Sequence, residues 1–270
     1  MNNLALRAIT GIVGVASIIT AVIYSPYTSA AIFGLIMLAT LKEFYGLARK
    51  VGSRPFEVWG LGFAIIFFAL IFFYFQMSLS PNLFWLLPAL FAIVFIYPLQ
   101  TIEKSHAIQC LAISILGVMY IAVPFSMIHS IGFIEGAYAY ELILGVLFLQ
   151  WANDTGAYFV GKAIGKRKLF EKVSPKKTWE GTIGGFLFGL VFAYGFFHFF
   201  GVLTLFEWMG LGIITAVFGT LGDLAESLFK RTLAIKDSGS ILPGHGGFLD
   251  RFDGLLLSLP FSAAYLHFIL

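Results

Sequence analysis

Charge is what this sequence has least of. Only 11% of its 270 residues are charged, whereas 59% are hydrophobic. A soluble domain usually carries about 25% charged residues, so this chain has too little polar surface to cover a water-soluble fold. A lipid bilayer removes that requirement, because apolar side chains face hydrocarbon and helices satisfy their own backbone groups. The composition predicts one compact helical membrane domain and excludes a pair of soluble domains.

Cysteine is almost absent as well. The single Cys110 lies in an apolar run, which excludes an intramolecular disulfide and predicts a small buried hydrophobe. A net charge of +3 is too small to indicate nucleic acid as a partner. The first apolar segment resembles a secretory signal, but further apolar runs follow it at once, so we interpret it as a retained anchor.

Apolar runs long enough to cross a hydrocarbon core of about 30 Å recur along the whole chain. We therefore predict an all-α, polytopic integral membrane protein with about nine transmembrane helices. Their ranges are Ala8–Tyr24, Ser29–Ala48, Val58–Met77, Leu83–Leu99, Ala107–Ile128, Leu142–Val160, Gly181–Leu205, Gly210–Phe229 and Gly254–Leu270.

Basic residues are missing from every second connection between these spans. Ser25–Thr28, Ser78–Asn82, Ser130–Glu141 and Phe206–Met209 contain none of the 17 Lys and Arg residues. The positive-inside rule then predicts a cytoplasmic N-terminus and an external C-terminus. We divide the chain into an N-terminal region of five spans, residues 1–141, and a catalytic region, residues 142–270, with four spans and two cytoplasmic loops.

Carboxylates lie within or beside the predicted spans of the second region. A charge inside a span costs roughly 2.5–3.5 kcal/mol on insertion scales, which makes such residues functional candidates. Asp154, Asp223 and Glu226 lie toward the cytoplasmic ends of their spans, and Asp250 and Asp253 precede the last span. Each acid taken alone could simply pair with a nearby Lys or Arg, but their gathering at one membrane surface favours a site.

The loop between spans six and seven is strongly basic. Ser174 and Pro175 have the residue types that begin a helix, and Lys176 and Lys177 would flank its free N–H groups, so we predict a phosphate site there. The alternative is that the loop only attracts anionic lipid. Beyond it, Gly181, Gly185 and Gly189 form a stripe of small residues that indicates close helix packing or a dimer face.

The segment from Asp223 to Asp253 is the most informative. Asp223 and Ser227 share a helical face, and Glu226 and Lys230 share another. Pro243-Gly244-His245-Gly246-Gly247 cannot form a regular helix, and its glycines can turn backbone N–H groups toward an anion. Carboxylates beside lysines and such a turn suit Mg²⁺ and a polyphosphate. His245 by itself is more typical of a loop than of a catalyst.

These motifs resemble one family. Ser227-Leu-Phe-Lys-Arg231, Lys236-Asp237-Ser-Gly239 and Leu242-Pro-Gly-His-Gly-Gly-Phe-Leu-Asp-Arg-Phe-Asp253 match the pattern that defines phosphatidate cytidylyltransferases, also called CDP-diacylglycerol synthases. Asp154-Thr-Gly-Ala-Tyr158 and Ser174-Pro-Lys-Lys-Thr-Trp-Glu-Gly181 resemble that family too. The motifs cover roughly residues 150–255, whereas the N-terminal half is similar only in hydropathy.

The resemblance implies that CTP and phosphatidic acid react to give CDP-diacylglycerol and pyrophosphate, with Mg²⁺ and optionally a second cation. We expect the catalytic residues to be Asp223, Asp250, Lys230, Arg231 and His245. We expect substrate contacts from Ser174, Lys176, Lys177, Ser227, Lys236, Asp237, Gly246, Gly247 and Arg251. We expect metal contacts from Asp223 and Asp250, with Asp253 and Asp154 as additional ligands.

The expected location is the bacterial cytoplasmic membrane, with the active site facing the cytoplasm, membrane lipids as surroundings and a homodimer as a possible assembly. The main alternative reaction is nucleotidyl transfer to another lipid phosphate, such as a polyprenyl phosphate. A membrane transporter is the alternative from another class, but transporters place ionisable groups near the membrane midplane. A non-catalytic scaffold would not need acids beside a glycine turn.

Overall fold

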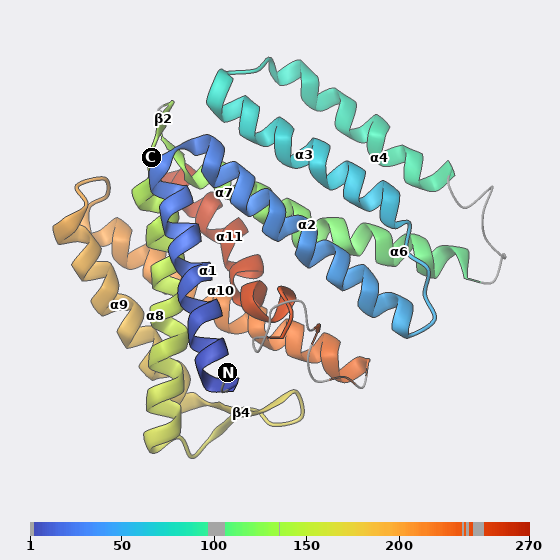
Figure 1. The fold of residues 1–270 in the computed structure, drawn as a ribbon. Coiled ribbons are helices and arrows are strands. Elements are labelled where there is room, and N and C mark those ends of the chain that lie inside the picture. Colours follow the sequence, from blue (N-terminus) through green and yellow to red (C-terminus); the bar gives the residue numbers. More distant parts are fainter. Residues whose placement is uncertain (1–2, 97–105, 135, 234, 236–237, 240–245) are drawn as a thin grey trace. The chain divides into compact units, whose positions relative to one another are not determined.

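The computed structural model describes residues 3–96, 106–134, 136–233, 235, 238–239 and 246–270 (Figure 1). Helices account for most of these residues, as the sequence predicts. The chain divides into two compact units. The first unit comprises Met1–Gly136 and Asp237–Asp250, and the second comprises Ala137–Lys236 and Arg251–Leu270. The functional division at residue 141 stays a prediction.

The first unit is built from helices that begin and end at recognisable residues. Ser25 caps α2 by accepting a hydrogen bond from the Thr28 N–H, and Pro26 follows it as the first helical residue. The elements are α1 (Asn3–Tyr24), α2 (Pro26–Lys50), α3 (Glu57–Met77), η1 (Pro81–Trp85), α4 (Leu86–Ile96), α6 (Ala107–Gly117), the π-helical turn η2 (Val118–Ala122), α7 (Val123–Ile131) and the strand β1 (Phe133–Ile134).

Tyr45 organises the core of this unit. Its fully buried side chain donates a hydrogen bond to the Ser114 carbonyl at 2.7 Å. Gly60 of α3 and Gly117 of α6 leave the space that its ring occupies, because a Cβ at either position would overlap it. Cys110 is buried and free, as predicted.

The second unit contains four long helices and one hairpin. The elements are β2 (Ala137–Tyr138), α8 (Tyr140–Ile164), β3 (Lys168–Phe170), β4 (Ser174–Thr178), α9 (Trp179–Phe199), α10 (Leu205–Thr232) and α11 (Leu249–Ile269), whose first two residues belong to the first unit. Strands β3 and β4 pair antiparallel, and Lys168 faces Thr178. Helices α8 and α9 therefore return side by side along each other (Figure 1).

Glycines bring α8 and α9 together. A Cβ on Gly181 would lie 2.8 Å from the Ala157 carbonyl oxygen, and one on Gly185 would lie 2.5 Å from the Asn153 carbonyl oxygen. Gly189, the third member of the stripe, is buried, and a Cβ there would lie 3.9 Å from the Gly212 carbonyl oxygen of α10. The small-residue stripe therefore serves packing within the unit.

The connection between α9 and α10 corrects one predicted span. The predicted range Gly181–Leu205 runs past the end of α9, which stops at Phe199, and the predicted connection Phe206–Met209 is the first turn of α10. Thr204 and Glu207 form a capping box in which each side chain accepts a hydrogen bond from the other's backbone N–H. This capping chemistry fixes the helix start five residues before the predicted one.

Six of the helical segments among the described residues are long and apolar enough to cross a membrane. They are Pro26–Lys50, Glu57–Met77, Ala107–Ile131, Trp179–Phe199, Leu205–Thr232 and Leu249–Ile269. Ile9–Tyr24 and Pro81–Ile96 are shorter apolar helices, and α8 carries Glu141, Asp154 and Lys162. The protein is therefore an integral membrane protein, while the count of nine spans and the orientation of the termini stay predictions.

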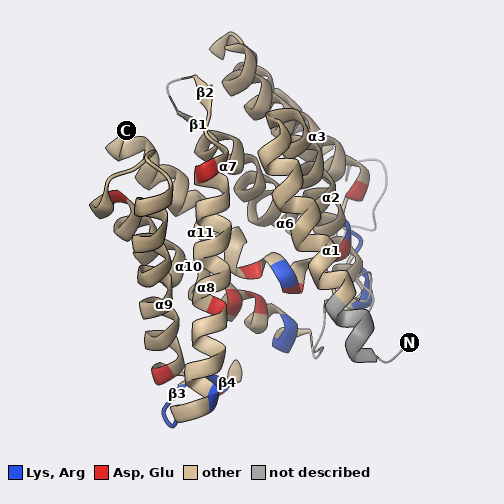
Figure 2. Ribbon diagram, turned by 60° about the vertical axis from the view of Figure 1, so that its left-hand side comes forward, with Lys and Arg blue, Asp and Glu red and all other residues tan. Residues whose placement is uncertain are grey.

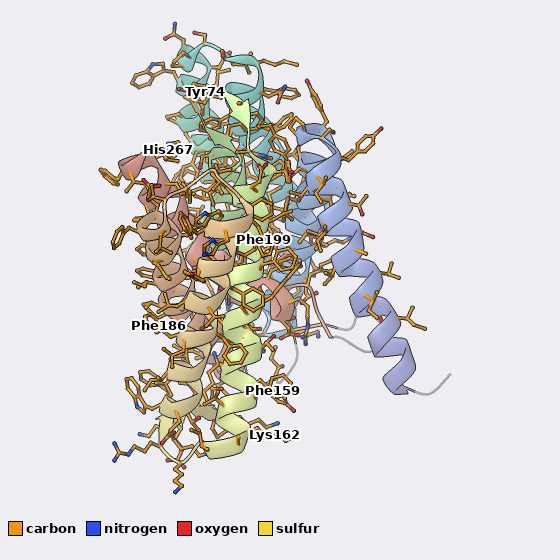
Figure 3. The ribbon with its side chains drawn as sticks, turned by 90° about the vertical axis from the view of Figure 1, so that its left-hand side faces the viewer. Tyr74, Phe159, Lys162, Phe186, Phe199 and His267 are labelled. Atoms are coloured by element: carbon orange, nitrogen blue, oxygen red, sulfur yellow. The ribbon has the colours of Figure 1, made fainter. Side chains whose placement is uncertain are left out.

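Large apolar side chains also cover the outside of the helices. Phe159 is 60% exposed and Phe199 is 84% exposed, and Figure 3 shows such side chains along α8 and α9, with Lys162 near the end of α8. Exposing so much apolar surface to water costs free energy, whereas the same surface in contact with lipid does not.

Candidate functional site

A cavity of about 400 Å³ opens in the second unit. Its charged lining comes from Asp154 and Lys162 of α8, Lys176 and Lys177 of β4, and Asp223 of α10. The remaining lining residues are Asn153, Ala157, Tyr158, Gly161, Thr178, Gly181, Thr182 and Thr220. Three separate stretches of sequence thus place three basic and two acidic side chains around one hollow.

The charges of this unit are unevenly distributed along its helices. Figure 2 shows basic segments around β3 and β4 and at the end of α10, whereas α9 beyond its first turn carries no Lys, Arg, Asp or Glu. Acids of α8 and α10 lie at both ends of these helices, since Glu141 and Glu207 are in their first turns, whereas Asp154 and Asp223 line the cavity together with the lysines of β4. The convergence of all five predicted acids at one membrane surface stays a prediction.

Lys177 and Asp223 form the central ion pair of the cavity. The Lys177 Nζ lies 2.6 Å from Asp223 Oδ2, and each side chain is about a quarter exposed. A lysine therefore neutralises the Asp223 carboxylate within its predicted span. This is the simple pairing with a nearby Lys or Arg that the sequence leaves open for each acid. Both residues also line the cavity, so the pair remains accessible to a ligand.

Asp154 is held by its own helix. Its Oδ1 accepts a hydrogen bond from the Gln150 Nε2 at 3.1 Å. Gln150 is buried between α10 and α11, where a Cβ on Gly219 would overlap it and one on Gly254 would lie 2.6 Å from its Nε2. Glycines at these two positions let Gln150 reach its place beside Asp154.

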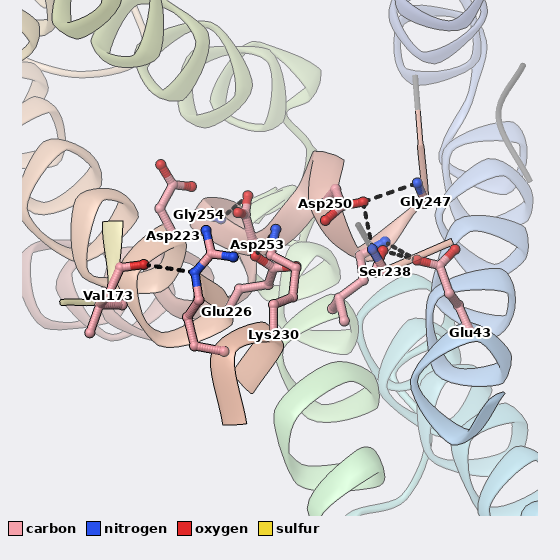
Figure 4. Close-up of polar contacts among 12 residues, drawn as sticks. Glu43, Val173, Asp223, Glu226, Lys230, Ser238, Gly247, Asp250, Asp253 and Gly254 are labelled. Atoms are coloured by element: carbon pink, nitrogen blue, oxygen red, sulfur yellow. Dashed lines mark hydrogen bonds and ion pairs between the residues drawn. The ribbon is translucent and has the colours of Figure 1, made fainter. Parts of the chain in front are cut away.

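Asp253 extends the acidic group toward α11. Its carboxyl interacts with that of Asp223 and lies within electrostatic range of Glu226. The close approach of α11 to α10 depends on Gly222, because a Cβ there would lie 2.5 Å from the Asp253 carbonyl oxygen. Glu226 pairs with Lys230 at 2.6 Å, one helical turn away, and this predicted pairing is confirmed (Figure 4).

The start of α9 differs from the prediction. Ser174 and Pro175 do not begin a helix but belong to strand β4, where Pro175 is tolerated because an edge strand leaves N–H positions unpaired. Thr178 is the actual N-cap and accepts a hydrogen bond from the Gly181 N–H at 3.2 Å. The lysines therefore reach the cavity from a strand that ends at the N-cap of α9.

Asp250 contacts the glycine turn in the first unit. Its Oδ2 accepts hydrogen bonds from the Ser238 N–H at 3.0 Å and the Gly247 N–H at 3.1 Å (Figure 4). Gly246 has a φ of +85°, a conformation that favours glycine. A carboxylate of the protein thus already engages part of the turn predicted to wrap a phosphate. His245, Lys236 and Asp237 lie outside the described residues.

The remaining predicted residues occupy the same helices. Ser227 is partly buried on α10, and Arg231 donates a hydrogen bond from Nε to the Val173 carbonyl at 3.3 Å, which ties α10 to the hairpin (Figure 4). Arg251 is exposed and lines a small hollow with Asp154 and Asp253.

The donor chemistry suits a hard cation. Mg²⁺ is usually bound by one or two carboxylates, with substrate phosphates and water completing its shell. Among the residues that the structure describes, no group of three or more His, Cys, Asp or Glu side chains forms a ready cation site. Mg²⁺ needs only one or two protein carboxylates. Asp223 together with Asp253 or Asp154 can supply them, because these carboxylates are neighbours in one unit.

Sequence reasoning missed several residues of this arrangement. Lys162 and the threonines of the cavity carry no signal beyond their polarity. Gln150 lies one turn before Asp154, and this spacing is the signal that it could contact the carboxylate. Outside this arrangement, Glu43 of the first unit also interrupts a predicted apolar span, so the rule that flagged Asp223 applies to it equally.

Comparison with known proteins gives consistent results. A family model described as the cytidylyltransferase family matches residues 5–269. The chain is 48% identical over 134 residues to a phosphatidate cytidylyltransferase of Haemophilus influenzae, covering 48% of this chain and 46% of that protein. It is 41% identical over 177 residues to one of Bacillus subtilis, covering 64% and 65%, and 37% identical over 177 residues to one of Staphylococcus aureus, covering 64% and 66%. The matched segments thus span less than two-thirds of each relative.

Proposed function

We propose, because this chain belongs to the cytidylyltransferase family, that it transfers the cytidylyl group of CTP to phosphatidic acid and releases pyrophosphate. The observation that carries the proposal is the cavity in which Lys162, Lys176 and Lys177 face Asp154 and Asp223. The relatives named phosphatidate cytidylyltransferase favour phosphatidic acid over a polyprenyl phosphate as the acceptor.

The reaction joins two anions, so its main obstacle is electrostatic. A phosphate oxygen of the lipid attacks the α-phosphorus of CTP, and the bond to the pyrophosphate oxygen breaks. Because that lipid oxygen is already ionised near neutral pH, no strong general base is needed. The ammonium groups of Lys162, Lys176 and Lys177 reduce the repulsion and stabilise the charge on the departing pyrophosphate.

Mg²⁺, when bound, would supply further neutralisation of the phosphates. Asp223 is the residue best placed to hold it, with Asp253 or Asp154 as the second carboxylate. Lys177 contacts the same Asp223 carboxylate and orients it toward the cavity. The assignment of Asp250 as a main ligand stays a prediction, since its Oδ2 accepts two backbone N–H groups.

The site lies at the end of the spans, which suits substrates of opposite solubility. The lipid reaches it sideways from the bilayer, and CTP arrives from the water. We place this end at the cytoplasmic face of the bacterial inner membrane, because the Lys and Arg residues of the unit gather there. A transporter is disfavoured by the same observation, since its ionisable groups belong near the midplane.

The experiment is an assay of purified protein in lipid nanodiscs with CTP and phosphatidic acid. We expect equimolar CDP-diacylglycerol and pyrophosphate, with no pyrophosphate when phosphatidic acid is omitted. Polyprenyl phosphate in place of phosphatidic acid tests the alternative acceptor, and the other nucleoside triphosphates test the base. Product formed with polyprenyl phosphate alone would contradict the proposal.

A matched pair of lysine variants tests the cavity. Lys177→Ala should lower kcat/KM for CTP by at least about tenfold, because a charge-assisted phosphate contact and the Asp223 pair are both lost. Lys172→Ala, an exposed lysine of the same hairpin outside the cavity lining, should stay within about twofold. Equal losses in both variants would favour general attraction to anionic lipid.

A further inference from the structure

Glu43 is a buried carboxylate that the function described above does not use. It lies in α2, within an apolar span, and is 7% exposed. Its Oε2 accepts a hydrogen bond from the Phe248 N–H at 2.9 Å, and its Oε1 accepts one from the Leu249 N–H at 3.3 Å. The Ser238 hydroxyl also donates to Oε1 (Figure 4). All these residues belong to the first unit.

These contacts explain how a carboxylate is tolerated there. Phe248 and Leu249 lie at the N-terminus of α11, where backbone N–H groups lack partners within the helix and carry partial positive charge. Charge-assisted hydrogen bonds to an ionised acceptor are roughly twice as strong as neutral ones. Glu43 therefore caps α11 from a residue 205 positions away in the sequence.

Gly239 and Gly247 both lie so close to the Glu43 side chain that neither position has room for a Cβ. A Cβ on Gly239 would lie 2.8 Å from the Glu43 Cδ. A Cβ on Gly247 would overlap both the Glu43 carboxylate and the Ser238 hydroxyl. Gly247 has no positive φ, unlike Gly246. Close approach to Glu43 thus explains the glycine at 247, whereas backbone conformation explains the glycine at 246.

Asp250 holds the same turn from its other side. Ser238 gives its hydroxyl to Glu43 and its N–H to Asp250. Gly247 gives its N–H to Asp250, and the next two N–H groups go to Glu43. The two carboxylates therefore bind different donors of the same turn, and Ser238 contacts both of them.

We propose that Glu43 is a positioning residue for the segment Gly246–Asp250. It touches no reacting group. Its charge holds this segment so that Asp250 takes the orientation that the transfer reaction requires. The inference rests on the proposed function for the role of Asp250 in the reaction.

Two substitutions in neighbouring positions test this role. Glu43→Gln keeps the shape but turns one acceptor into a donor that faces an N–H or O–H group. We expect kcat to fall at least about tenfold with little change in KM for CTP or lipid, given the strength of hydrogen bonds to charged groups. Lys42→Gln, an exposed residue beside it, should leave both parameters within about twofold.

A double-mutant cycle separates positioning from general damage. Ser238→Ala removes one donor to Glu43 and should lower kcat less than Glu43→Gln. The double variant should be no slower than Glu43→Gln alone, because both changes break one shared contact. Additive losses would contradict the proposal, as would an unchanged kcat in Glu43→Gln.

Hydrogen exchange gives a readout that does not depend on activity. In intact protein in nanodiscs, the amides of Phe248 and Leu249 should exchange at least about tenfold faster in Glu43→Gln than in wild type or Lys42→Gln. Unchanged exchange in Glu43→Gln would overturn the proposed contact, whether or not the protein is active. Absence of CDP-diacylglycerol formation by the wild type would refute only the proposed function. Faster exchange with unchanged kcat would make the contact structural only and overturn the positioning role.

Discussion

At the scale of single residues, the carboxylates of this protein are neutralised in different ways. Asp223 pairs with Lys177 and Glu226 with Lys230. Glu43 and Asp250 instead accept hydrogen bonds from backbone N–H groups. The first kind of partner can be exchanged for a ligand, because a side chain moves more easily than a helix terminus. This difference makes Asp223 the better candidate for a metal and Asp250 the more constrained one.

Asp223→Asn should lower turnover by at least about 10², since it removes the charge that would hold the cation facing the substrate phosphates. The loss should grow at limiting Mg²⁺, measured as pyrophosphate release over a Mg²⁺ titration. Glu141→Gln, in the first turn of α8, serves as the control and should behave as wild type. Near-normal rates for Asp223→Asn at limiting Mg²⁺ would assign that carboxylate a structural role.

Glu226→Gln should affect stability more than turnover. Glu226 is fully buried and Lys230 is 16% exposed, so removing one partner leaves a buried charge, at a cost of about 3–5 kcal/mol. The fraction that remains folded should still turn over at a rate near that of wild type. Thermal unfolding in detergent measures the loss, and Glu226→Gln combined with Lys230→Met should recover part of it. An unchanged melting temperature for the single variant contradicts the expectation.

At the scale of elements, capping and glycine contacts decide where helices begin and how closely they lie. Thr178 and Thr204 cap α9 and α10 by accepting backbone hydrogen bonds. Gly181 and Gly185 then allow α9 to approach α8. The result places β4, with Lys176 and Lys177, beside the ends of α8 and α10.

Gly185→Ala should destabilise the second unit by about 1–3 kcal/mol, because the added Cβ would lie 2.5 Å from the Asn153 carbonyl oxygen. Gly195→Ala on the same helix meets no atom within 4 Å and should be neutral or slightly stabilising, since alanine favours helix. Thermal unfolding of both variants in one detergent provides the comparison. A Gly185→Ala protein as stable as Gly195→Ala would mean that the α8–α9 contact is looser than described.

At the scale of the whole molecule, the distribution of charge along the chain predicts the membrane topology. Of the 17 Lys and Arg residues, Arg7 precedes the first predicted span, Lys42 lies inside the second, and the others fall in alternate connections. Apolar side chains along the helices face outward, as lipid contact requires. The second unit thus presents exposed apolar side chains along its helices and a cavity lined by charged side chains.

Cysteines introduced at Ser80 and Lys168 should label from opposite sides of the membrane in a background where Cys110 is replaced by alanine. Ser80 falls in an external connection and Lys168 in a cytoplasmic one, according to the positive-inside rule. Membrane-impermeant maleimide applied to right-side-out and inverted vesicles measures this. Labelling of both positions from the same side would contradict the predicted orientation.

The amino-acid sequence by itself determined the fold class and most of the helical segments. Low charge and recurring apolar runs require a helical membrane protein, and carboxylates inside those runs identify Asp154, Asp223 and Glu226. The i, i+4 pairing of Glu226 with Lys230 was predictable because it depends only on helix geometry. The family resemblance of the motifs is likewise a property of local sequence.

Only the tertiary structure decided which partners the charged groups take. Lys177 meets Asp223, 46 residues away, and Glu43 meets Phe248, 205 residues away. Ser174 and Pro175 read locally as a helix start, yet pairing with β3 places them in a strand and leaves the cap to Thr178. Hydrogen bonds and ion pairs act over a few ångströms of space, so separation along the chain carries no information about them until the helices have packed.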